Sequence, residues 1–245
     1  MIINKKIIID NIKTIFYALI IATIIRSFFI QPFYIPSSSM EPTLLIGDRL
    51  FVTKYSYGYS RHSFPFSVPI ISGRIFSSSP KPGDVIVFKT PADNRTDYIK
   101  RLIGLPGDTV QFKDGKLFLN GNEILRTRVN NRYKIRCGSL SPEVNSFKET
   151  LPNGKEYIAV YNKLGTMQNT DEYKVPSSHF FFLGDNRDCS KDSRYLSSVG
   201  YVSNENLVGK ASIIFFSNDT VSGSVFKFWN WDQSLRIERF FNLLK

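Results

Sequence analysis

Residues 97–122 read DYIKRLIGLPGDTVQFKDGKLFLNGN, and the pattern of this stretch predicts the fold class of the chain. Short runs rich in apolar and β-branched residues are separated by turn signals. Lys113-Asp114-Gly115-Lys116 lies between two such runs and is a strong signal for a tight β-hairpin, and Asn120-Gly121-Asn122 signals a second turn. We therefore expect consecutive antiparallel strands here.

The same composition extends in both directions. Further strand-like runs occupy Asp48–Tyr55, Asp84–Lys89, Tyr98–Ile103, Thr109–Phe112, His179–Leu183 and Ala211–Phe216. Residues 126–175 are polar and turn-rich, which indicates an inserted smaller lobe. Clear helical periodicity after Pro32 returns only over about the last 15 residues. We expect a mostly β chain: one antiparallel domain over residues 31–245 with an inserted lobe at 126–175, preceded by a single helix.

The N-terminus predicts a membrane anchor. Residues 14–25, TIFYALIIATII, carry no charge, and the apolar run resumes after Arg26 as far as Ile30. A helix over residues 14–30 is about 25 Å long, at the short end for a membrane span. Three lysines precede it, so the positive-inside rule places residues 1–13 in the cytoplasm and the rest outside. A cleaved leader and a buried core helix are the alternatives; the bulky residues after the run disfavour a cleavage site.

Bulk composition narrows the classes of function. The net charge of +11 suggests an anionic partner, and a membrane surface fits better than nucleic acid because the cations are dispersed. Only Cys137 and Cys189 are present, with no metal-site spacing around them. We expect both to be free structural thiols; a disulfide formed in an oxidising compartment is the alternative, because sequence alone cannot place the two residues within bonding distance. We expect neither a metal nor an organic cofactor.

The two histidines limit nucleophilic chemistry. His62 lies in a proline-rich apolar loop and His179 opens a strand, so a histidine-based hydrolase is disfavoured. Ser78 and Lys81 match a bare SxxK pattern, but Pro80 would break the helix on which that motif must lie.

Three other segments carry candidate chemistry. The first is residues 36–44, PSSSMEPTL, where prolines stiffen the backbone around three serines. A rigid linker leaving the membrane is the alternative, and chemistry alone does not choose among Ser37, Ser38 and Ser39.

The second segment is residues 97–108, in which alternation separates Lys100 from Arg101 on a strand. A Lys100 buried among apolar groups would have a lowered pKa and could act as a base. A solvated pair of cations on an edge strand is the alternative. The third segment is residues 184–194, GDNRDCSKDSR, a dense polar set after an apolar strand. It could position a site by ion pairs or form a polar turn.

Together these segments resemble the type I signal peptidases, a bacterial family of Ser/Lys proteases that remove export signals. PSSSMEPTL, PGDVIVF at 82–88, DYIKRLIGLPGD and GDNRDCSKDSR occur in the order found in that family. The resemblance extends from the anchor to about Phe216 and implies a mostly antiparallel β fold with an inserted lobe.

The resemblance also assigns roles. It implies Ser39 as nucleophile, Lys100 as general base, and the Ser37 hydroxyl with the Ser39 backbone N–H as oxyanion hole. The supporting residues that it implies are Ser190, which orients the lysine, the ion pair of Asp192 with Arg194, and Asp185. The pockets for Ala-x-Ala side chains fall on Phe33, Ile35, Tyr98 and Ile99.

The implied enzyme is a membrane-bound serine endopeptidase acting on signal-peptide-bearing preproteins through an acyl-enzyme. We expect a monomer in the bacterial cytoplasmic membrane with its catalytic domain on the outer side. A self-cleaving regulatory Ser/Lys protease and a non-enzymatic membrane-tethered β module are the alternatives.

The catalytic domain is also expected to contact lipid directly. Residues 63–76, SFPFSVPIISGRIF, are apolar and broken by Pro and Gly, so they form either a core-packing loop or a surface that dips into lipid. At the C-terminus, residues 226–245 carry aromatic residues suited to a membrane interface, with Arg236 and Arg239 available to anionic headgroups. Those aromatic residues are Trp229, Trp231, Phe240 and Phe241.

Overall fold

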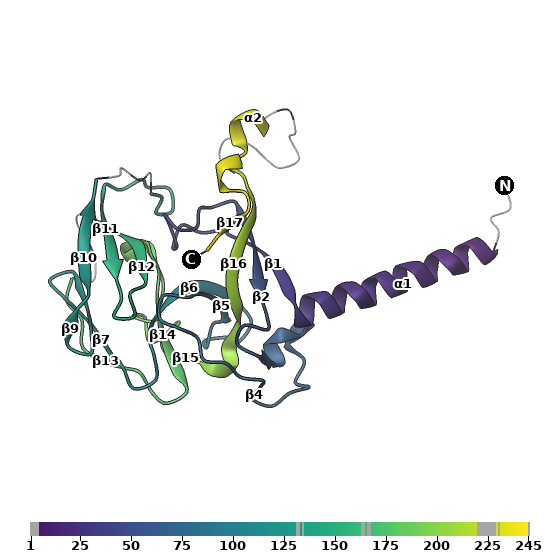
Figure 1. Ribbon diagram of the computed structural model, residues 1–245, viewed down its shortest axis with the longest axis horizontal. Coiled ribbons are helices and arrows are strands. Elements are labelled where there is room, and N and C mark those ends of the chain that lie inside the picture. Colours follow the sequence, from purple (N-terminus) through teal and green to yellow (C-terminus); the bar gives the residue numbers. More distant parts are fainter. Residues whose placement is uncertain are drawn as a thin grey trace.

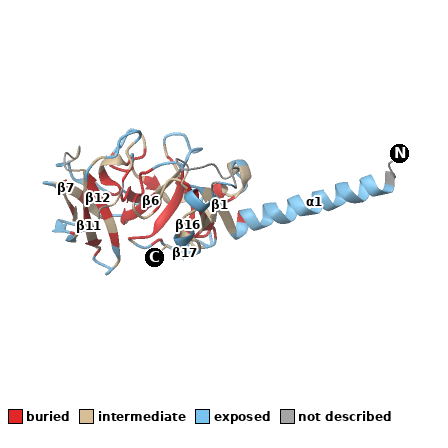
Figure 2. Cartoon of the chain, turned by 90° about the horizontal axis from the view of Figure 1, so that it is seen from above, coloured by how far each residue is buried: buried red, intermediate tan, exposed pale blue. Residues whose placement is uncertain are grey.

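The computed structural model describes residues 5–130, 133, 135–162, 165, 168–219, 229 and 231–244. The chain begins with helix α1 (Lys5–Phe28), which stands clear of the β body in Figure 1 and is coloured as exposed along almost all of its length in Figure 2. Within the described residues it is the one helix long and apolar enough to cross a membrane, and none of its apolar stretch is buried against the rest of the protein. A core helix is therefore excluded. The helix ends at Phe28, and Ile30 already begins the first strand.

The described residues that follow are mostly β, as predicted. The largest sheet has eight antiparallel strands. Along the sheet these are β1 (Ile30–Tyr34), β2 (Asp48–Thr53), β16 (Leu207–Ser217), β5 (Val85–Lys89), β6 (Asp97–Gly104), β14 (His179–Leu183) and β15 (Val202–Ser203), with β17 (Asn242–Leu243) beside β16. Every run expected to be a strand lies within or overlaps one of these strands or strand β7 (Thr109–Lys113).

Three smaller sheets complete the β body. One contains β13 (Tyr173–Lys174), β7 (Thr109–Lys113), β8 (Lys116–Leu119) and β9 (Asn122–Glu123); a second contains β10 (Leu125–Val129), β11 (Val144–Thr150) and β12 (Glu156–Asn162); a third pairs β3 (Tyr59–Ser60) with β4 (Arg74–Ile75). The hairpin predicted at residues 113–116 joins β7 to β8. Asp114 and Gly115 both have positive φ, at 49° and 68°, which is why the Asp-Gly pair suits this turn.

Strand β5 shows how the sequence builds the core. Its side chains alternate between two hydrophobic clusters, one containing Val85 and Val87 and the other Ile86 and Phe88. Both faces of the strand are buried, so it is a continuous apolar run rather than an alternating one. Buried residues accordingly fill the β body in Figure 2.

The two cysteines form a disulfide, so the expectation of free thiols is wrong. The Cα atoms of Cys137 and Cys189 are 5.6 Å apart although 52 residues separate them in sequence. Backbone hydrogen bonds at Arg136 bring this segment into place: its N–H donates to Glu41 Oε2 (2.7 Å) and its carbonyl accepts from Asn186 (3.2 Å). Sequence spacing alone contains none of this information.

The C-terminus differs from the helix that its periodicity predicts. Helix α2 (Trp231–Ser234) is a single turn, followed by a 3-10 turn at Ile237–Arg239 and then β17; residues 226–228, 230 and 245 lie outside the described residues. Arg239 forms an ion pair with Asp48 (2.6 Å), and Arg236 donates to Ile46 O (2.9 Å). These two arginines are thus held against the protein, and the expectation that they are available to headgroups is wrong.

Residues 61–76 pack against the end of α1 and form little regular structure, in agreement with their Pro and Gly content. They contain two 3-10 turns, Arg61–Ser63 and Pro65–Ser67. The Phe28 ring meets Phe64 and Tyr59 edge-on, and the Tyr59 hydroxyl donates to Phe28 O (2.9 Å). The loop is therefore fixed beside the point at which the helix meets the β body.

Candidate active site

The three serines at residues 37–39 lie in the loop between β1 and β2, and Asn186 holds this loop by its main chain. The Asn186 backbone N–H donates to Ser39 O (3.2 Å), and its side-chain amide donates to Ser38 O (3.1 Å). Ser38 and Ser39 are both buried. Two hydrogen bonds from Asn186, which lies 148 residues after Ser38 in the sequence, therefore fix the main chain that carries the Ser39 hydroxyl.

Lys100 points from β6 at Ser39. Its Nζ lies 2.6 Å from Ser39 Oγ and 2.9 Å from the carbonyl oxygen of Ile99. Its side chain is fully enclosed, and this burial lowers the pKa of Lys100 to about 8, although Asp192 and Asp185 act in the opposite direction. A neutral amine has a lone pair that can accept the hydroxyl proton of Ser39 across this distance.

A second hydroxyl stands beside the first. Ser37 Oγ lies 3.4 Å from Ser39 Oγ, and the Ser39 backbone N–H donates to none of the residues that the structure describes. A hydroxyl and an N–H converging near an activated serine can stabilise negative charge on a reacting carbonyl oxygen. The arrangement can therefore supply a nucleophile, a base and an oxyanion site.

Ser39 and Lys100 face a cleft of about 540 Å³. All four side chains expected to contact substrate line it: Phe33, Ile35, Tyr98 and Ile99. Ser37, Ser39 and Lys100 lie in its wall, and Lys191 adds a cation that the sequence pattern had not singled out. The lining is mostly apolar, so the cleft suits an extended segment with small apolar side chains.

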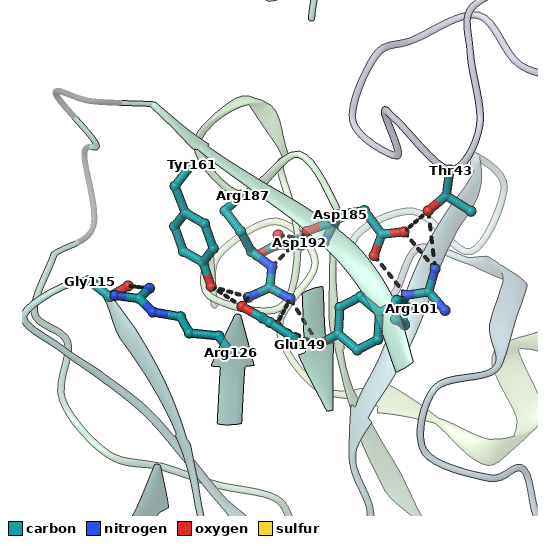
Figure 3. Close-up of polar contacts among 11 residues, drawn as sticks. Thr43, Arg101, Gly115, Arg126, Glu149, Tyr161, Asp185, Arg187 and Asp192 are labelled. Atoms are coloured by element: carbon teal, nitrogen blue, oxygen red, sulfur yellow. Dashed lines mark hydrogen bonds and ion pairs between the residues drawn. The ribbon is translucent and has the colours of Figure 1, made fainter. Parts of the chain in front are cut away.

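Behind the dyad, Arg101 and Asp185 form a buried ion pair. Asp185 accepts from Arg101 Nε (2.7 Å) and Nη2 (2.6 Å), and Thr43 donates to the same carboxylate (2.5 Å). Figure 3 shows this fork linking β6, the segment after β14 and the nucleophile loop. The pair thus fixes the loop of Ser39 relative to the strand of Lys100.

Figure 3 also shows a second buried ion pair, which sequence reasoning missed. Arg187 bonds both carboxylate oxygens of Glu149 (2.7 and 3.1 Å), and the hydroxyls of Tyr157 and Tyr161 donate to the same carboxylate. This cluster attaches β11 and β12 of the smaller sheets to the segment after β14. Arg187 lies within the polar stretch 184–194, but its partner on β11 carries no sequence signal.

Asp192 and Arg194 form a third buried ion pair (2.8 Å). Burial alone would raise the pKa of Asp192, but Arg194 outweighs it and the pKa is lowered. Asp192 also accepts from the Gly184 N–H (3.0 Å). Ser190 is buried beside this pair, and a side-chain hydrogen bond from Ser190 is among the effects that lower the pKa of Asp192.

Gly184 is a further residue that the sequence analysis passed over. A Cβ at this position would overlap both the Ser190 side chain and the carbonyl oxygen of Ser39. The absence of a side chain at Gly184 therefore allows the nucleophile loop and the Ser190 segment to approach each other.

The alternative catalytic groups lie elsewhere. His62 lines a different cavity, where its Nε2 accepts from Arg61 (3.3 Å), and His179 Nδ1 lies beside Ser177 O (2.8 Å). Ser78 is exposed, and residues 77–81 are not helical. Among the described residues no group of three or more His, Cys, Asp or Glu side chains could hold a metal ion.

Comparison with known proteins gives consistent results. The family model described as "Signal peptidase, peptidase S26" matches residues 8–216. The chain is 41% identical to signal peptidase I of Rickettsia akari and 42% identical to that of Rickettsia conorii, covering 93% of this chain and 90% of each relative. A crystal structure of a signal peptidase I from Enterococcus faecalis is 28% identical, covering 55% of this chain and 98% of that one, with a TM-score of 0.33, too low to support an argument about the fold.

Proposed function

This chain belongs to the S26 family of signal peptidases, serine proteases that cleave signal peptides, and from that premise we propose that Ser39 and Lys100 perform the cleavage as a catalytic dyad. The observation that carries the proposal is the 2.6 Å separation of Lys100 Nζ from Ser39 Oγ inside a buried site. Burial, which lowers the pKa of Lys100 to about 8, supplies the neutral base that the reaction needs.

The reaction follows from these two groups. Neutral Lys100 takes the hydroxyl proton of Ser39 as Oγ forms a bond to the scissile carbonyl carbon. The carbon–nitrogen bond then breaks, and the leaving amine takes the proton from Lys100. Water, deprotonated by the same lysine, hydrolyses the resulting ester and frees the Ser39 hydroxyl.

Negative charge on the carbonyl oxygen is stabilised by the Ser37 hydroxyl and the Ser39 N–H. The 3.4 Å separation of the two serine hydroxyl oxygens supports this assignment. Each such donor is typically worth about 3 kcal/mol of transition-state stabilisation. Asp185, Asp192, Arg194 and Ser190 act as positioning residues behind the dyad.

The substrate is the end of a signal peptide of Ala-x-Ala type. Strand β1 is an edge of the large sheet, so its free backbone groups can pair with an extended peptide lying in the cleft. The apolar walls at Phe33, Ile35, Tyr98 and Ile99 then accept small alternate side chains. Lys191 lies at this cleft without a described carboxylate partner.

The proposed cellular arrangement is a monomer anchored once in the bacterial cytoplasmic membrane. Residues 1–13 face the cytoplasm, residues 14–30 span, and residues 31–245 form the outer catalytic domain with its lobe at 126–175. The lysines before the span support this orientation. Signal-peptide-bearing preproteins and membrane lipid are the partners, and the chemistry requires no cofactor.

A turnover assay on a fluorogenic Ala-x-Ala signal peptide tests the proposal. Ser39→Ala should lower kcat by at least about 10⁴-fold because the nucleophile is removed. Ser78→Ala, an exposed serine with the same substitution, should retain wild-type activity. Strong cleavage by folded Ser39→Ala protein would overturn the assignment.

A further inference from the structure

A second cavity, of about 510 Å³, lies where α1 meets the β body. Arg26, in the last turn of the helix, lines it together with Gln31 at the start of β1. The 3-10 turns at residues 61–67 and the turn at residues 93–97 supply most of the remaining wall. Nothing in the proposed cleavage mechanism uses this cavity.

The cavity is lined by four cations and two carboxylates. The cations are Arg26, Arg61, Lys89 and Arg95, and the carboxylates are Asp93 and Asp97. Most of the negative charge is already engaged. Lys89 pairs with Asp97 (2.9 Å), and Asp93 accepts from the backbone N–H groups of Arg95 (2.8 Å) and Thr96 (3.0 Å).

Two of the four cations form no ion pair with a described carboxylate, so their charge is available to a bound anion. Within the described residues, neither Arg26 nor Arg95 has a carboxylate at ion-pair distance. Arg61 has one, Glu205 at 3.2 Å. The cavity thus presents two arginine guanidinium groups, which are suited to forked hydrogen bonding with phosphate oxygens.

A buried lysine adds to the positive field. Lys54 is 1% exposed, and its Nζ has one long hydrogen bond, to the carbonyl of the cavity residue His62 (3.5 Å). Burial lowers the pKa of Lys54 to about 7; Asp97 opposes this shift, whereas Arg26 and Lys89 contribute to it. His62 adds no further positive charge, because burial and nearby cations hold its pKa at about 4 and keep it neutral. An anion in the cavity would relieve this repulsion.

The segment that supplies Phe66 to the cavity wall carries exposed apolar side chains. Phe66 is 100% exposed, Phe76 83% and Ile70 69%. Phe66 is held outward although its φ of 60° is unfavourable for a residue with a side chain. The Phe28 ring packs edge-on against Phe64 and Tyr59, which fixes the start of this loop beside the end of α1.

We propose that this cavity binds the phosphate of an anionic phospholipid headgroup, with Phe66, Ile70 and Phe76 inserted among the adjacent acyl chains. The inference rests on the proposed placement of α1 in the membrane and adds a lipid site next to the catalytic cleft, with which the cavity shares the wall residue Asp97. Arg26 sets the depth: an arginine at the end of a spanning segment lies at the level of the lipid phosphates. The cavity that it lines is at the same level.

Lipid binding by the purified full-length chain in nonionic detergent tests the proposal. Native mass spectrometry would follow titration with dioleoyl phosphatidylglycerol, with dioleoyl phosphatidylcholine as the zwitterionic comparison. Arg95→Gln should weaken phosphatidylglycerol binding about fivefold and Arg26→Gln with Arg95→Gln about 25-fold, since each cation near lipid contributes about a fivefold factor. Arg128→Gln, an exposed arginine on β10, is the matched control and should change nothing.

Three results would overturn the lipid site. The first is equal binding of the two lipids, and the second is an equal effect of Arg95→Gln and Arg128→Gln. The third is displacement of bound lipid by inorganic phosphate at the same concentration, which would make the cavity a site for free phosphate. Cleavage of a short soluble peptide, followed in the same samples, should be unchanged in both single variants. If the wild-type protein does not cleave the soluble peptide, the proposed dyad is contradicted, whereas the lipid-binding result still stands.

Discussion

Two buried lysines on the same large sheet make an informative pair. Lys100 on β6 and Lys54 at the end of β2 are 3% and 1% exposed, and burial lowers both pKa values, to about 8 and about 7. Lys100 has the hydroxyl oxygen of Ser39 at 2.6 Å, whereas Lys54 has only a carbonyl oxygen at 3.5 Å. A lowered pKa is therefore a general consequence of burial, and the aligned hydroxyl of Ser39 distinguishes Lys100, the proposed base, from Lys54.

Burying a lysine of this kind also lowers the stability of the folded state. Below pH 8 Lys100 is charged in both the folded and unfolded states, so the folded state carries the full penalty of a buried charge. As pH rises from 8 towards 10.5 only the unfolded chain stays protonated, and stability increases by about 3 kcal/mol. Stability therefore does not account for a lysine at this position, whereas the proposed role of Lys100 as a base does.

The largest expected effect separates the two lysines directly. Lys100→Met should lower kcat/KM by at least about 10⁴-fold, because the base is lost, whereas Lys54→Met should leave cleavage of a soluble peptide within about threefold. Steady-state kinetics with a fluorogenic peptide measures both. Chemical denaturation should show Lys100→Met more stable than wild type by up to about 3 kcal/mol at pH 7. Comparable activity losses in the two variants would remove the distinction.

A smaller effect on kcat is expected from substituting a glycine near each of the two lysines. Gly184→Ala should reduce kcat by about 100-fold, since a methyl group would push Ser190 or Ser39 out of place. Gly209→Ala is the matched control: its Cβ would overlap the carbonyl oxygen of Thr53, beside Lys54. Both variants should lose about 1–3 kcal/mol of stability, but only the first should lose kcat when assayed folded. Unchanged kcat in Gly184→Ala would show that the close packing is not needed for catalysis.

The disulfide is expected to affect activity least. Replacing Cys137 and Cys189 with serine should lower the free energy of unfolding by about 2–4 kcal/mol, because the 52-residue loop is no longer closed. Activity at low temperature should fall by less than about tenfold, since Asn186 and the buried ion pairs still hold the cleft. Thermal unfolding with and without reductant provides the measurement. A variant as stable as the oxidised wild type would argue against the disulfide.

Much of the site was predictable from local sequence, because the chemistry lies in short segments. Alternation on β6 predicted that Lys100 and Arg101 point in opposite directions, and the Asp-Gly turn predicted the β7–β8 hairpin. The tertiary pairings were not predictable. The Cys137–Cys189 disulfide joins segments far apart in the chain, and Lys54 reads as an ordinary residue after a strand until α1 and residues 61–67 cover it.

The prediction of a C-terminal helix was wrong for a related reason. Periodicity predicts a helix there, but Arg236 and Arg239 find partners at Ile46 and Asp48, and these contacts hold the chain in 3-10 and extended form after one helical turn. Local helical preference is weak enough for such tertiary contacts to override it.

The pH dependence of kcat/KM tests most directly whether neutral Lys100 is the base for Ser39. This parameter reports ionisations of the free enzyme. In the wild type its acidic limb should have a midpoint near pH 8, with activity rising as Lys100 loses its proton, and Lys54→Met should leave that midpoint in place. A limb near the ordinary lysine value of 10.5, or one that moves when Lys54 rather than the dyad is changed, would contradict the account.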